Sequence, residues 1–224
     1  MISIIIPVYN EEKMLKERRG YFSVISKEAE LIFVDGGSSD HSVEWVSGLG
    51  HLIRSVKNRA FQMNEGAKAA KNDILLFLHV DSKIEPEAIR SMESLMRDGK
   101  YAGGCFRQVI DQVGLLYRWI AWTGNIRARV TKIFYGDQGI FVRKNIFDSM
   151  QGYPKTDLAE DVLFSKKLKK FGRVKVMEHP ILCSSRRWIR QGIVKTFVLN
   201  MRISLCLLFG LKIDRFAKCY HDIR

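Results

Sequence analysis

The sequence predicts an α/β protein with a mostly parallel central sheet flanked by helices, followed by a helical C-terminal segment. Three short apolar runs, Ile2–Ile6, Leu31–Val34 and Ile74–Leu78, show no polar alternation. Such runs are typical of strands that are buried on both faces of a parallel sheet. Helical patterns separate the runs as far as residue 98, and this alternation predicts βαβ units with right-handed crossovers.

The first hundred residues alternate between the two kinds of element. Residues 11–28 predict a helix, although Arg18, Arg19 and Gly20 interrupt its apolar stripe. Because proline suits the first turn of a helix, another helix is expected to begin near Pro86. The remaining elements of this half are a helix from about residue 39, a strand over 52–55 and a helix over 60–71.

Beyond residue 98 the alternation becomes irregular. The expected elements are a strand over Gly103–Val109, a helix over Leu115–Val130, a strand over Gly139–Val142, a helix over Glu160–Phe171 and a strand over Val174–Met177. In the helix over Glu160–Phe171 we expect Phe164, Leu168 and Phe171 to face inward, with a lysine-rich outer face.

The last forty residues predict a long apolar helix. Its stripe at helical spacing consists of Ile193, Phe197, Met201, Leu205 and Leu208. The longest stretch without a charge, Ile203–Leu211, is shorter than the roughly 20 apolar residues that span a bilayer. This segment therefore suits packing on the domain, on a second subunit or in a membrane interface.

Charge and cysteine usage narrow the classes of partner and compartment. The formal net charge of +13 indicates an anionic partner: nucleic acid, nucleotide phosphates or an acidic membrane surface. The four cysteines form no C-x-x-C pair, which argues against a zinc site and a disulfide framework. No secretory leader pattern is evident either, so we expect a cytoplasmic protein.

Polar residues follow each of the three apolar runs. In open α/β sheets, ligands bind beyond the carboxyl ends of the strands, so these side chains are expected to converge on one crevice. They are Tyr9, Asn10, Glu11, Asp35, Asp40, His79 and Asp81.

His79 and Asp81 are candidate metal ligands. Side chains alternate along an extended backbone, so these two point to the same side. Mg²⁺ prefers carboxylates together with substrate phosphates, and Mn²⁺ accepts carboxylate and imidazole together. The alternative is that Asp81 and Ser82 only cap a turn.

The segment Asp35–Asp40, with the sequence Asp-Gly-Gly-Ser-Ser-Asp, lies between a strand and a helix. Its glycines let the backbone approach a ligand, and the start of a helix favours a phosphate. The alternative is a tight turn with Asp or Ser as the cap. Neither G-x-G-x-x-G after the first strand nor G-x-x-x-x-G-K is present, which argues against dinucleotide and P-loop sites.

Three later groups carry candidate chemistry. Glu160-Asp161 opens a helix, and one carboxylate is a candidate general base, although both could simply match the helix dipole. Asp137 and Gln138 could bind hydroxyl groups. The cluster Arg186-Arg187-Trp188 suits phosphate and sugar contacts, because arginine binds phosphate and tryptophan stacks on sugars.

Taken in order, these segments resemble family 2 glycosyltransferases with the GT-A fold. The motifs that carry the resemblance are Ser3–Glu11, Val34–Asp40, Phe77–Ser82 and Glu160-Asp161. Four others resemble a bacterial subgroup of small, single-domain members: Asn58–Gly66, Leu75–His79, Tyr135–Arg143 and Ser185–Trp188. His79 departs from the family pattern, because it replaces the first Asp of the metal-binding D-x-D.

The resemblance implies a metal-dependent, inverting glycosyltransferase that uses Mn²⁺ or Mg²⁺. It would move a sugar from a UDP- or GDP-linked donor to an acceptor hydroxyl. The domain would cover residues 1–182, with a nucleotide-sugar half at 1–100 and an acceptor half at 101–182, followed by a basic, apolar tail at 183–224.

The resemblance also implies a role for each site residue. On the donor side it places Pro7, Tyr9, Glu11, Asp35, Arg59, His79 and Asp81, with Asp81 and His79 at the metal. On the acceptor side it places Asp137, Gln138, Arg187 and Trp188, with Asp161 as the base beside Glu160.

The main alternative is a non-catalytic nucleotide- or membrane-binding module on the same fold. A binding module has no need of a base, so Asp161 argues against it. A nucleotidyltransferase is expected to show a glycine-rich basic loop after the first strand, which Pro7–Glu11 is not. We expect no nucleic acid partner. The tail would dock on the inner face of a membrane, where it would present a lipid-linked acceptor, or would form a homo-oligomer.

Overall fold

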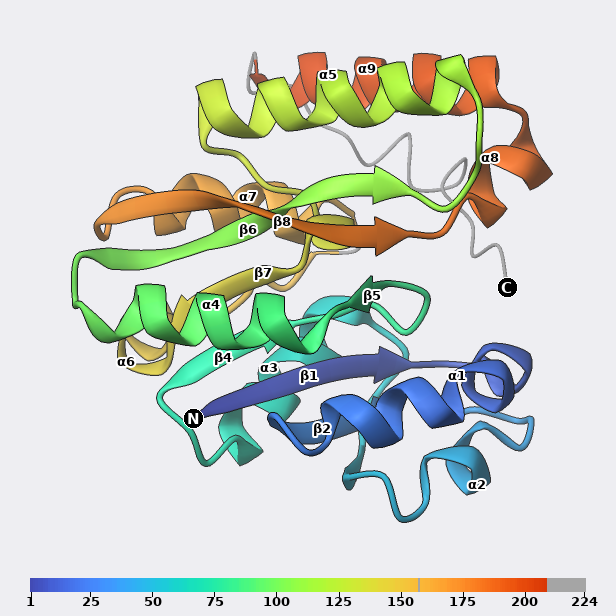
Figure 1. Ribbon diagram of the computed structural model, residues 1–224, viewed down its shortest axis with the longest axis vertical. Helices are drawn as coiled ribbons and strands as arrows, with labels where there is room; N and C mark the ends of the chain where they lie inside the picture. Colours follow the sequence, from blue (N-terminus) through green and yellow to red (C-terminus); the bar gives the residue numbers. More distant parts are fainter. Residues whose placement is uncertain (157, 209–224) are drawn as a thin grey trace.

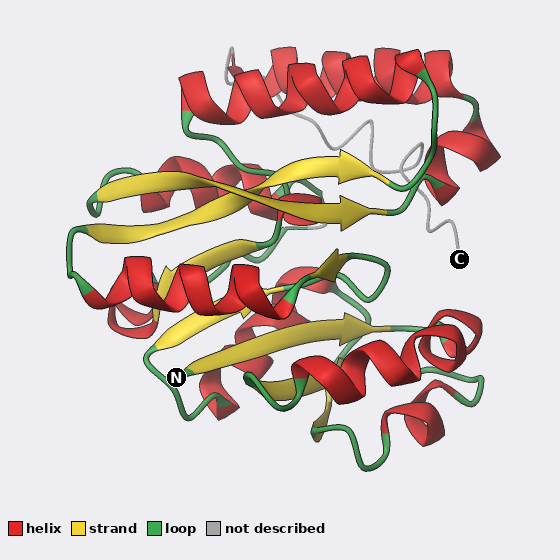
Figure 2. Cartoon of the chain, in the orientation of Figure 1, coloured by secondary structure: helices red, strands yellow, loops and turns green. Residues whose placement is uncertain are grey.

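The computed structural model describes residues 1–156 and 158–208, and this part of the chain forms one sheet of eight strands (Figures 1 and 2). The spatial order is β3-β2-β1-β4-β7-β6-β8-β5. The strands are β1 (Ile2–Val8), β2 (Glu30–Asp35), β3 (His51–Arg54), β4 (Ile74–Phe77), β5 (Lys83–Ile84), β6 (Tyr101–Ile110), β7 (Ile140–Arg143) and β8 (Arg173–Cys183).

The sheet is mostly parallel, as the sequence predicts. Strands β1 to β4 pair in parallel, and Ile4 of β1 lies opposite Leu31 of β2 and Leu76 of β4. β7 pairs antiparallel with both β4 and β6, β8 is parallel to β6, and β5 is antiparallel to β8. Only β7 and β5 therefore run against the other described strands.

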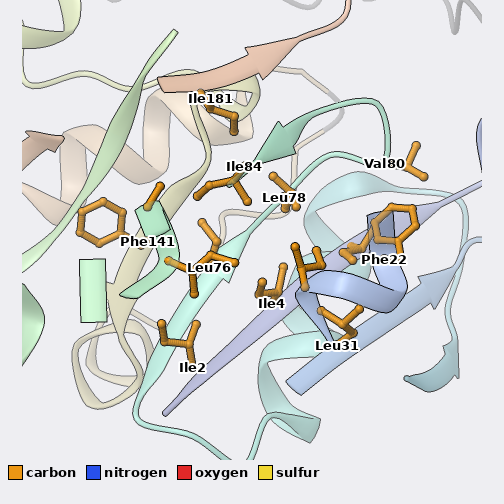
Figure 3. Packing of buried hydrophobic residues seen from close by; sticks show 14 of the residues in the cluster. Ile2, Ile4, Phe22, Leu31, Leu76, Leu78, Val80, Ile84, Phe141 and Ile181 are labelled. Atoms are coloured by element: carbon orange, nitrogen blue, oxygen red, sulfur yellow. The ribbon is translucent and has the colours of Figure 1, made fainter. Parts of the chain in front are cut away.

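The central strands are buried on both faces, which explains their continuous apolar runs. Ile4 of β1 packs in a cluster with Phe22 and Ile89, whereas its neighbour Ile5 packs on the opposite face with Met63. Figure 3 shows the first of these clusters, in which Phe22 lies above Leu31 and Ile4.

Helices cover both faces of the sheet. α1 (Glu12–Ile25) and α4 (Pro86–Arg97) contribute to one core cluster, while α3 (Arg59–Ala69), α6 (Lys144–Ser149) and α7 (Glu160–Leu168) contribute to the other. α2 (Ser42–Val46) follows β2, and a short 3₁₀ helix spans Gly136–Gln138. α5 (Leu115–Thr131), α8 (Arg186–Gln191) and α9 (Ile193–Leu208) form a further layer beyond β6 and β8 (Figure 1).

Four elements differ from the sequence prediction. β8 continues to Cys183 rather than ending at Met177, because a register shift between Phe106 and Arg107 of β6 accommodates Pro180. The two-residue β5 and the short α6 were not predicted, since neither is long enough to show a period. Phe171 is 42% exposed rather than inward-facing, because α7 ends at Leu168.

The C-terminal helix α9 contributes to two apolar clusters, one with α7 and one with α5. In α9, Thr196 and Ile203 are buried, whereas Met201 is 45% exposed. Leu205 and Leu208 of the predicted stripe have side chains outside the described residues, as do residues 209–224 of the predicted tail. Within the described residues, no helix combines the length and the apolar character that crossing a bilayer requires.

Two helical glycines are expected to respond oppositely to the same substitution. Gly66 of α3 sits against the sheet, and an added methyl group would lie 2.4 Å from Ile5 Cγ2. Gly20 of α1 has no atom within 4 Å of that position. Alanine favours helix by about 1 kcal/mol at both sites, so Gly20→Ala should stabilise, while Gly66→Ala should destabilise by about 1–3 kcal/mol. Urea unfolding measures the change in the free energy of unfolding for each variant. A change of the same sign in both variants would contradict the packing argument.

Candidate active site

A cleft of about 390 Å³ lies beyond the carboxyl ends of β1 and β4. In Figure 1 the arrowheads of β1, β6 and β8 point toward the side where α8 lies. The structure brings most of the predicted site residues together around this cleft: Pro7, Glu11, Arg59, His79, Asp81, Asp137, Glu160, Asp161, Arg187 and Trp188.

Two predicted donor-side residues lie outside the cleft lining. Tyr9 stacks beneath Lys57, whose Nζ is 4.3 Å from the ring centre and which does line the cleft. Asp35 is 2% exposed, and its carboxylate accepts hydrogen bonds from the backbone N–H of Gly37 and Ser38 and from the Ser38 hydroxyl. The carboxylate of Asp35 thus caps its own turn, and its contact with a base stays a prediction.

Gln138 also stands apart from the cleft, because it is fully buried. Its Oε1 accepts hydrogen bonds from Arg127 Nη2 at 3.0 Å and from the Tyr135 N–H at 3.1 Å. The Arg127 guanidinium in turn lies 3.3 Å from the centre of the Tyr135 ring. In this structure Gln138 supports the wall of the site, and its contact with an acceptor stays a prediction.

Arg186 links the two strand ends on which the donor site was predicted. Its Nη atoms donate to both carboxylate oxygens of Glu11 at 2.7 and 2.8 Å, and its Nε lies 3.0 Å from Asp81 Oδ2. Burial alone would lower the pKa of Arg186, but the two carboxylates raise it above its usual range. Asp111 Oδ1 fixes the start of α8 by accepting from the Ser185 N–H at 2.8 Å.

Arg18 supports the same region from α1. The sequence marks it as an interruption of an apolar stripe, but its side chain is buried and donates to the Val80 carbonyl at 3.3 Å. Burial lowers the pKa of Arg18, and the nearby charge of Asp81 partly opposes that effect. Arg18 therefore packs inward because the Val80 carbonyl accepts its hydrogen bond and the Asp81 carboxylate offsets its charge.

Asp161 lies on the side of the cleft where the acceptor was predicted to bind, and backbone groups fix its carboxylate. Its Oδ2 accepts from the Gly136 N–H at 2.6 Å, and its Oδ1 accepts from the Val162 N–H at 2.7 Å. Removal from water raises the pKa of Asp161, and these backbone donors oppose the rise. Each oxygen retains a further lone pair, so the carboxylate can still accept a proton.

Glu160 and Asp137 lie beside Asp161 and share its environment. Removal from water, together with the Asp161 charge, raises the pKa of Glu160 to about 7. Arg59 Nη1 approaches Glu160 at 3.7 Å. Removal from water also raises the pKa of Asp137 to about 6. Such raised values are typical of carboxyl groups with a function in proton transfer.

Asp137 has an oxygen available for a ligand. Its Oδ2 accepts from Gln108 Nε2 at 2.7 Å, while its buried Oδ1 has no hydrogen-bond partner among the described residues. A buried carboxylate oxygen without a donor costs free energy, and a hydroxyl group of a ligand would satisfy it. Binding of a substrate hydroxyl by Asp137 stays a prediction, and Oδ1 is the atom that would make the contact.

Gln62 of α3 holds together two strand ends beside the cleft, and the sequence did not predict this role. Its Nε2 donates to the carbonyls of Val8 and Val34 at 2.8 and 2.7 Å, at the ends of β1 and β2. The side-chain amide bridges two strand ends where they lead into the site. No local pattern marks this role, although Gln62 falls within the Asn58–Gly66 motif.

The residues around His79 offer part of a divalent-cation site. A methyl group added to Gly136 would lie 2.8 Å from His79 Nε2 and 3.5 Å from Asp161 Oδ2, so both atoms border one small space. Imidazole and carboxylate ligands suit Mn²⁺. Within the described chain no three His, Cys, Asp or Glu side chains group closely enough to hold a cation, and Arg186 contacts Asp81. The described residues thus place one imidazole and one carboxylate beside the same space, and ligation of a cation by His79 and Asp81 stays a prediction.

Comparison with known proteins identifies the family. The sequence model described as glycosyl transferase family 2 matches residues 3–158. The chain belongs to this family. This confirms the predicted resemblance to family 2 glycosyltransferases.

Two curated relatives are undecaprenyl-phosphate 4-deoxy-4-formamido-L-arabinose transferases. The one from Proteus mirabilis is 29% identical over 170 residues, which cover 66% of this chain and 51% of the relative. The one from Yersinia enterocolitica is 29% identical over 119 residues, which cover 47% of this chain and 36% of the relative. This family 2 chain thus spans about half or less of the length of these relatives.

Solved structures show the same fold. Residues 1–349 of Staphylococcus aureus TarS in complex with UDP-GlcNAc superpose with a TM-score of 0.63 at 19% identity, covering 82% of this chain and 58% of that one. The mannosyltransferase PcManGT from Pyrobaculum calidifontis, in complex with GDP-Man and Mn²⁺, gives 0.61 at 17% identity, covering 90% and 64%. The fold is that of the GT-A glycosyltransferases, as the sequence predicts.

The raised pKa of Glu160 predicts a stability that depends on pH. Because the folded-state pKa of about 7 exceeds the ordinary 4.5, folding favours the protonated carboxyl, and that stabilisation is lost as the pH rises through about 7. Between about pH 5 and pH 8, wild type should lose roughly 1–2 kcal/mol more of unfolding free energy than Glu160→Gln, which urea titration measures. Glu87→Gln, in the first turn of α4, is the matched control. Parallel pH curves for wild type and Glu160→Gln would contradict the assignment.

Proposed function

We propose that this family 2 protein is a metal-assisted, inverting glycosyltransferase. It transfers a sugar from a UDP- or GDP-linked donor to a hydroxyl group of a lipid-linked acceptor. The observation that carries the proposal is one cleft that joins Asp81 and His79, at the end of β4, to the fixed carboxylate of Asp161 at the start of α7.

The donor side of the cleft suits a nucleoside diphosphate. Pro7 lies near the end of β1 and Glu11 follows that strand. Arg59 is the first residue of α3, and its guanidinium lies 3.7 Å from the Glu160 carboxylate. A cation held by His79 and Asp81 would offset the negative charge that develops on the leaving diphosphate. The TarS and PcManGT structures contain a UDP-sugar and a GDP-sugar with Mn²⁺, which supports this class of donor.

The acceptor side supplies a base. The acceptor oxygen would attack the anomeric carbon on the face opposite the diphosphate, and the electron pair of the broken bond would leave with the diphosphate. The acceptor proton would pass to Asp161, whose orientation is fixed by the N–H groups of Gly136 and Val162. A positioned base contributes roughly 10²–10⁴-fold to such a rate.

The charges of the acceptor side favour a hydroxyl over a phosphate as the nucleophile. Asp137, Glu160 and Asp161 would repel an incoming phosphate, whereas an alcohol needs a carboxylate to take its proton. The relatives are named for undecaprenyl phosphate, which supports a lipid-linked acceptor, whereas the choice of a hydroxyl nucleophile rests on the carboxyl groups of this chain alone. Arg187 and Trp188 line the cleft where such an acceptor would enter.

A non-catalytic binding module on the same fold is the alternative. A module that only bound nucleotide would gain nothing from three carboxyl groups removed from water, because each raises the free energy of the ionised fold. A panel of nucleotide sugars with Mn²⁺ or Mg²⁺, read as released nucleotide, tests for turnover. Release from no member of the panel, with or without a lipid-linked saccharide acceptor, would favour the module.

Substitutions of Asp161 and of Asp81 should impair different steps, the first sugar transfer and the second donor binding. Asp161→Asn should retain donor binding by calorimetry and lose transfer by roughly 10²–10⁴-fold, because the amide cannot take the proton. Asp81→Ala should weaken donor binding in the presence of Mn²⁺. The exposed Asp148→Asn serves as the control for loss of a carboxylate. Near wild-type transfer by Asp161→Asn would show that another group is the base.

Arg186 should compete with a cation for Asp81. Removing its guanidinium in Arg186→Ala leaves Glu11 and Asp81 with less positive charge nearby, so Mn²⁺ should bind several-fold more tightly. Electron paramagnetic resonance of unbound Mn²⁺ measures the affinity. Arg190→Ala, in the same helix, controls for net charge. An unchanged or weaker Mn²⁺ affinity in Arg186→Ala would mean that Asp81 does not ligate the ion.

A further inference from the structure

Helix α5 presents an apolar stripe to solvent. The stripe repeats at intervals of three and four residues, so its members share one face of the helix. Each is between 41% and 82% exposed: Leu115, Trp119, Trp122, Ile126 and Val130. The opposite face, with Ile120, Ala121 and Ala128, is buried, so the exposed stripe is additional to the face that packs on the domain.

Helix α9 carries a second exposed stripe beside the first. Val194, Val198 and Met201 share one face at the same spacing and are 74%, 40% and 45% exposed. The ring of Trp119 lies 5.2 Å from that of Phe197, which joins α5 to α9. We call the two stripes together the α5–α9 face. Contiguous apolar surfaces of this kind mark interaction sites.

The helices that form the α5–α9 face carry positive charges and no negative ones. Residues 112–136 and 184–208 contain no Asp or Glu. Arg118 and Arg129 border the stripe of α5, and Lys195 and Arg202 border that of α9. Glu178 of β8 pairs with Arg129 at 2.7 Å. An apolar stripe with basic flanks matches an anionic surface.

We infer that the α5–α9 face docks on an anionic lipid bilayer, with both helices lying in the plane of the interface. Tryptophan rings sit well at the level of the lipid headgroups, and the basic flanks would meet lipid phosphates. A second copy of the chain fits less well, because a symmetric dimer would bring the same basic flanks together.

The same helices border the cleft, so docking would orient the site. Asn200 and Ile203 of α9 line the cleft, and Trp188 of α8 both lines it and packs in the cluster of α5. Docking would hold the cleft near the headgroups, where the reactive end of a lipid-linked acceptor lies. This orienting role rests on the proposed function, whereas the docking itself does not.

Vesicle flotation of the full chain tests the inference without donor or acceptor. Binding to phosphatidylglycerol vesicles should exceed binding to phosphatidylcholine vesicles and should fall as salt rises from about 0.05 to about 0.5 M. The double variant Trp122→Ser/Val194→Ser should bind anionic vesicles about tenfold or more weakly. Val24→Ser/Val56→Ser, on exposed sites outside the α5–α9 face, should bind as wild type.

Three results would overturn the inference: equal binding to neutral and anionic vesicles, unchanged binding by the Trp122→Ser/Val194→Ser variant, or a dimer in solution that this variant dissociates. Light scattering measures the last, and urea unfolding checks that both double variants fold. Vesicle binding with no sugar transfer would reject the proposed function and leave the docking surface intact. Sugar transfer without vesicle binding would reject the docking surface and leave the proposed function intact.

Discussion

The contact of Arg186 with Glu11 and Asp81 holds the C-terminal helical layer to the edge of the sheet. It joins residues 175 positions apart in the chain, and the guanidinium fills the space between two strand ends. With Arg18 close by, two cations balance two carboxylates at this corner of the predicted donor side. A diphosphate that enters together with a divalent cation disturbs this balance little, whereas either species alone would leave a buried charge without compensation.

The side of the cleft that we propose for the acceptor has the opposite character. Asp137, Glu160 and Asp161 crowd negative charge where water is scarce, and burial raises the pKa of each. This arrangement weakens the fold as the pH rises, but it keeps a carboxylate ready to hold a proton near neutral pH. On one side of the cleft the positive and negative charges balance, whereas on the other side carboxyl groups repel one another. That contrast fits a site where one substrate brings phosphates and the other brings a hydroxyl group.

Local patterns predicted a mostly parallel sheet, because β1, β2 and β4 are apolar on both faces and polar at their ends; they did not predict the antiparallel direction of β7 or the existence of β5. The convergence of Glu11, His79 and Asp81 follows from parallel pairing alone. The sequence could not place Arg186 or Gln62, since both act on strand ends far away in the chain. It treated Arg18 as a defect because its carbonyl partner lies 62 positions away. The inward turn of Gln138 depends on Arg127, which no periodicity marks.

The bridge from Gln62 to the carbonyls of Val8 and Val34 makes the two walls of the site unequal in stiffness. One side-chain amide ties the ends of β1 and β2 together, so that wall is braced through backbone atoms. The wall formed by α8 is held through side-chain ion pairs, which can exchange partners without unravelling a helix or strand. We therefore expect α8, rather than the ends of β1 and β2, to shift when ligands of different size enter the cleft.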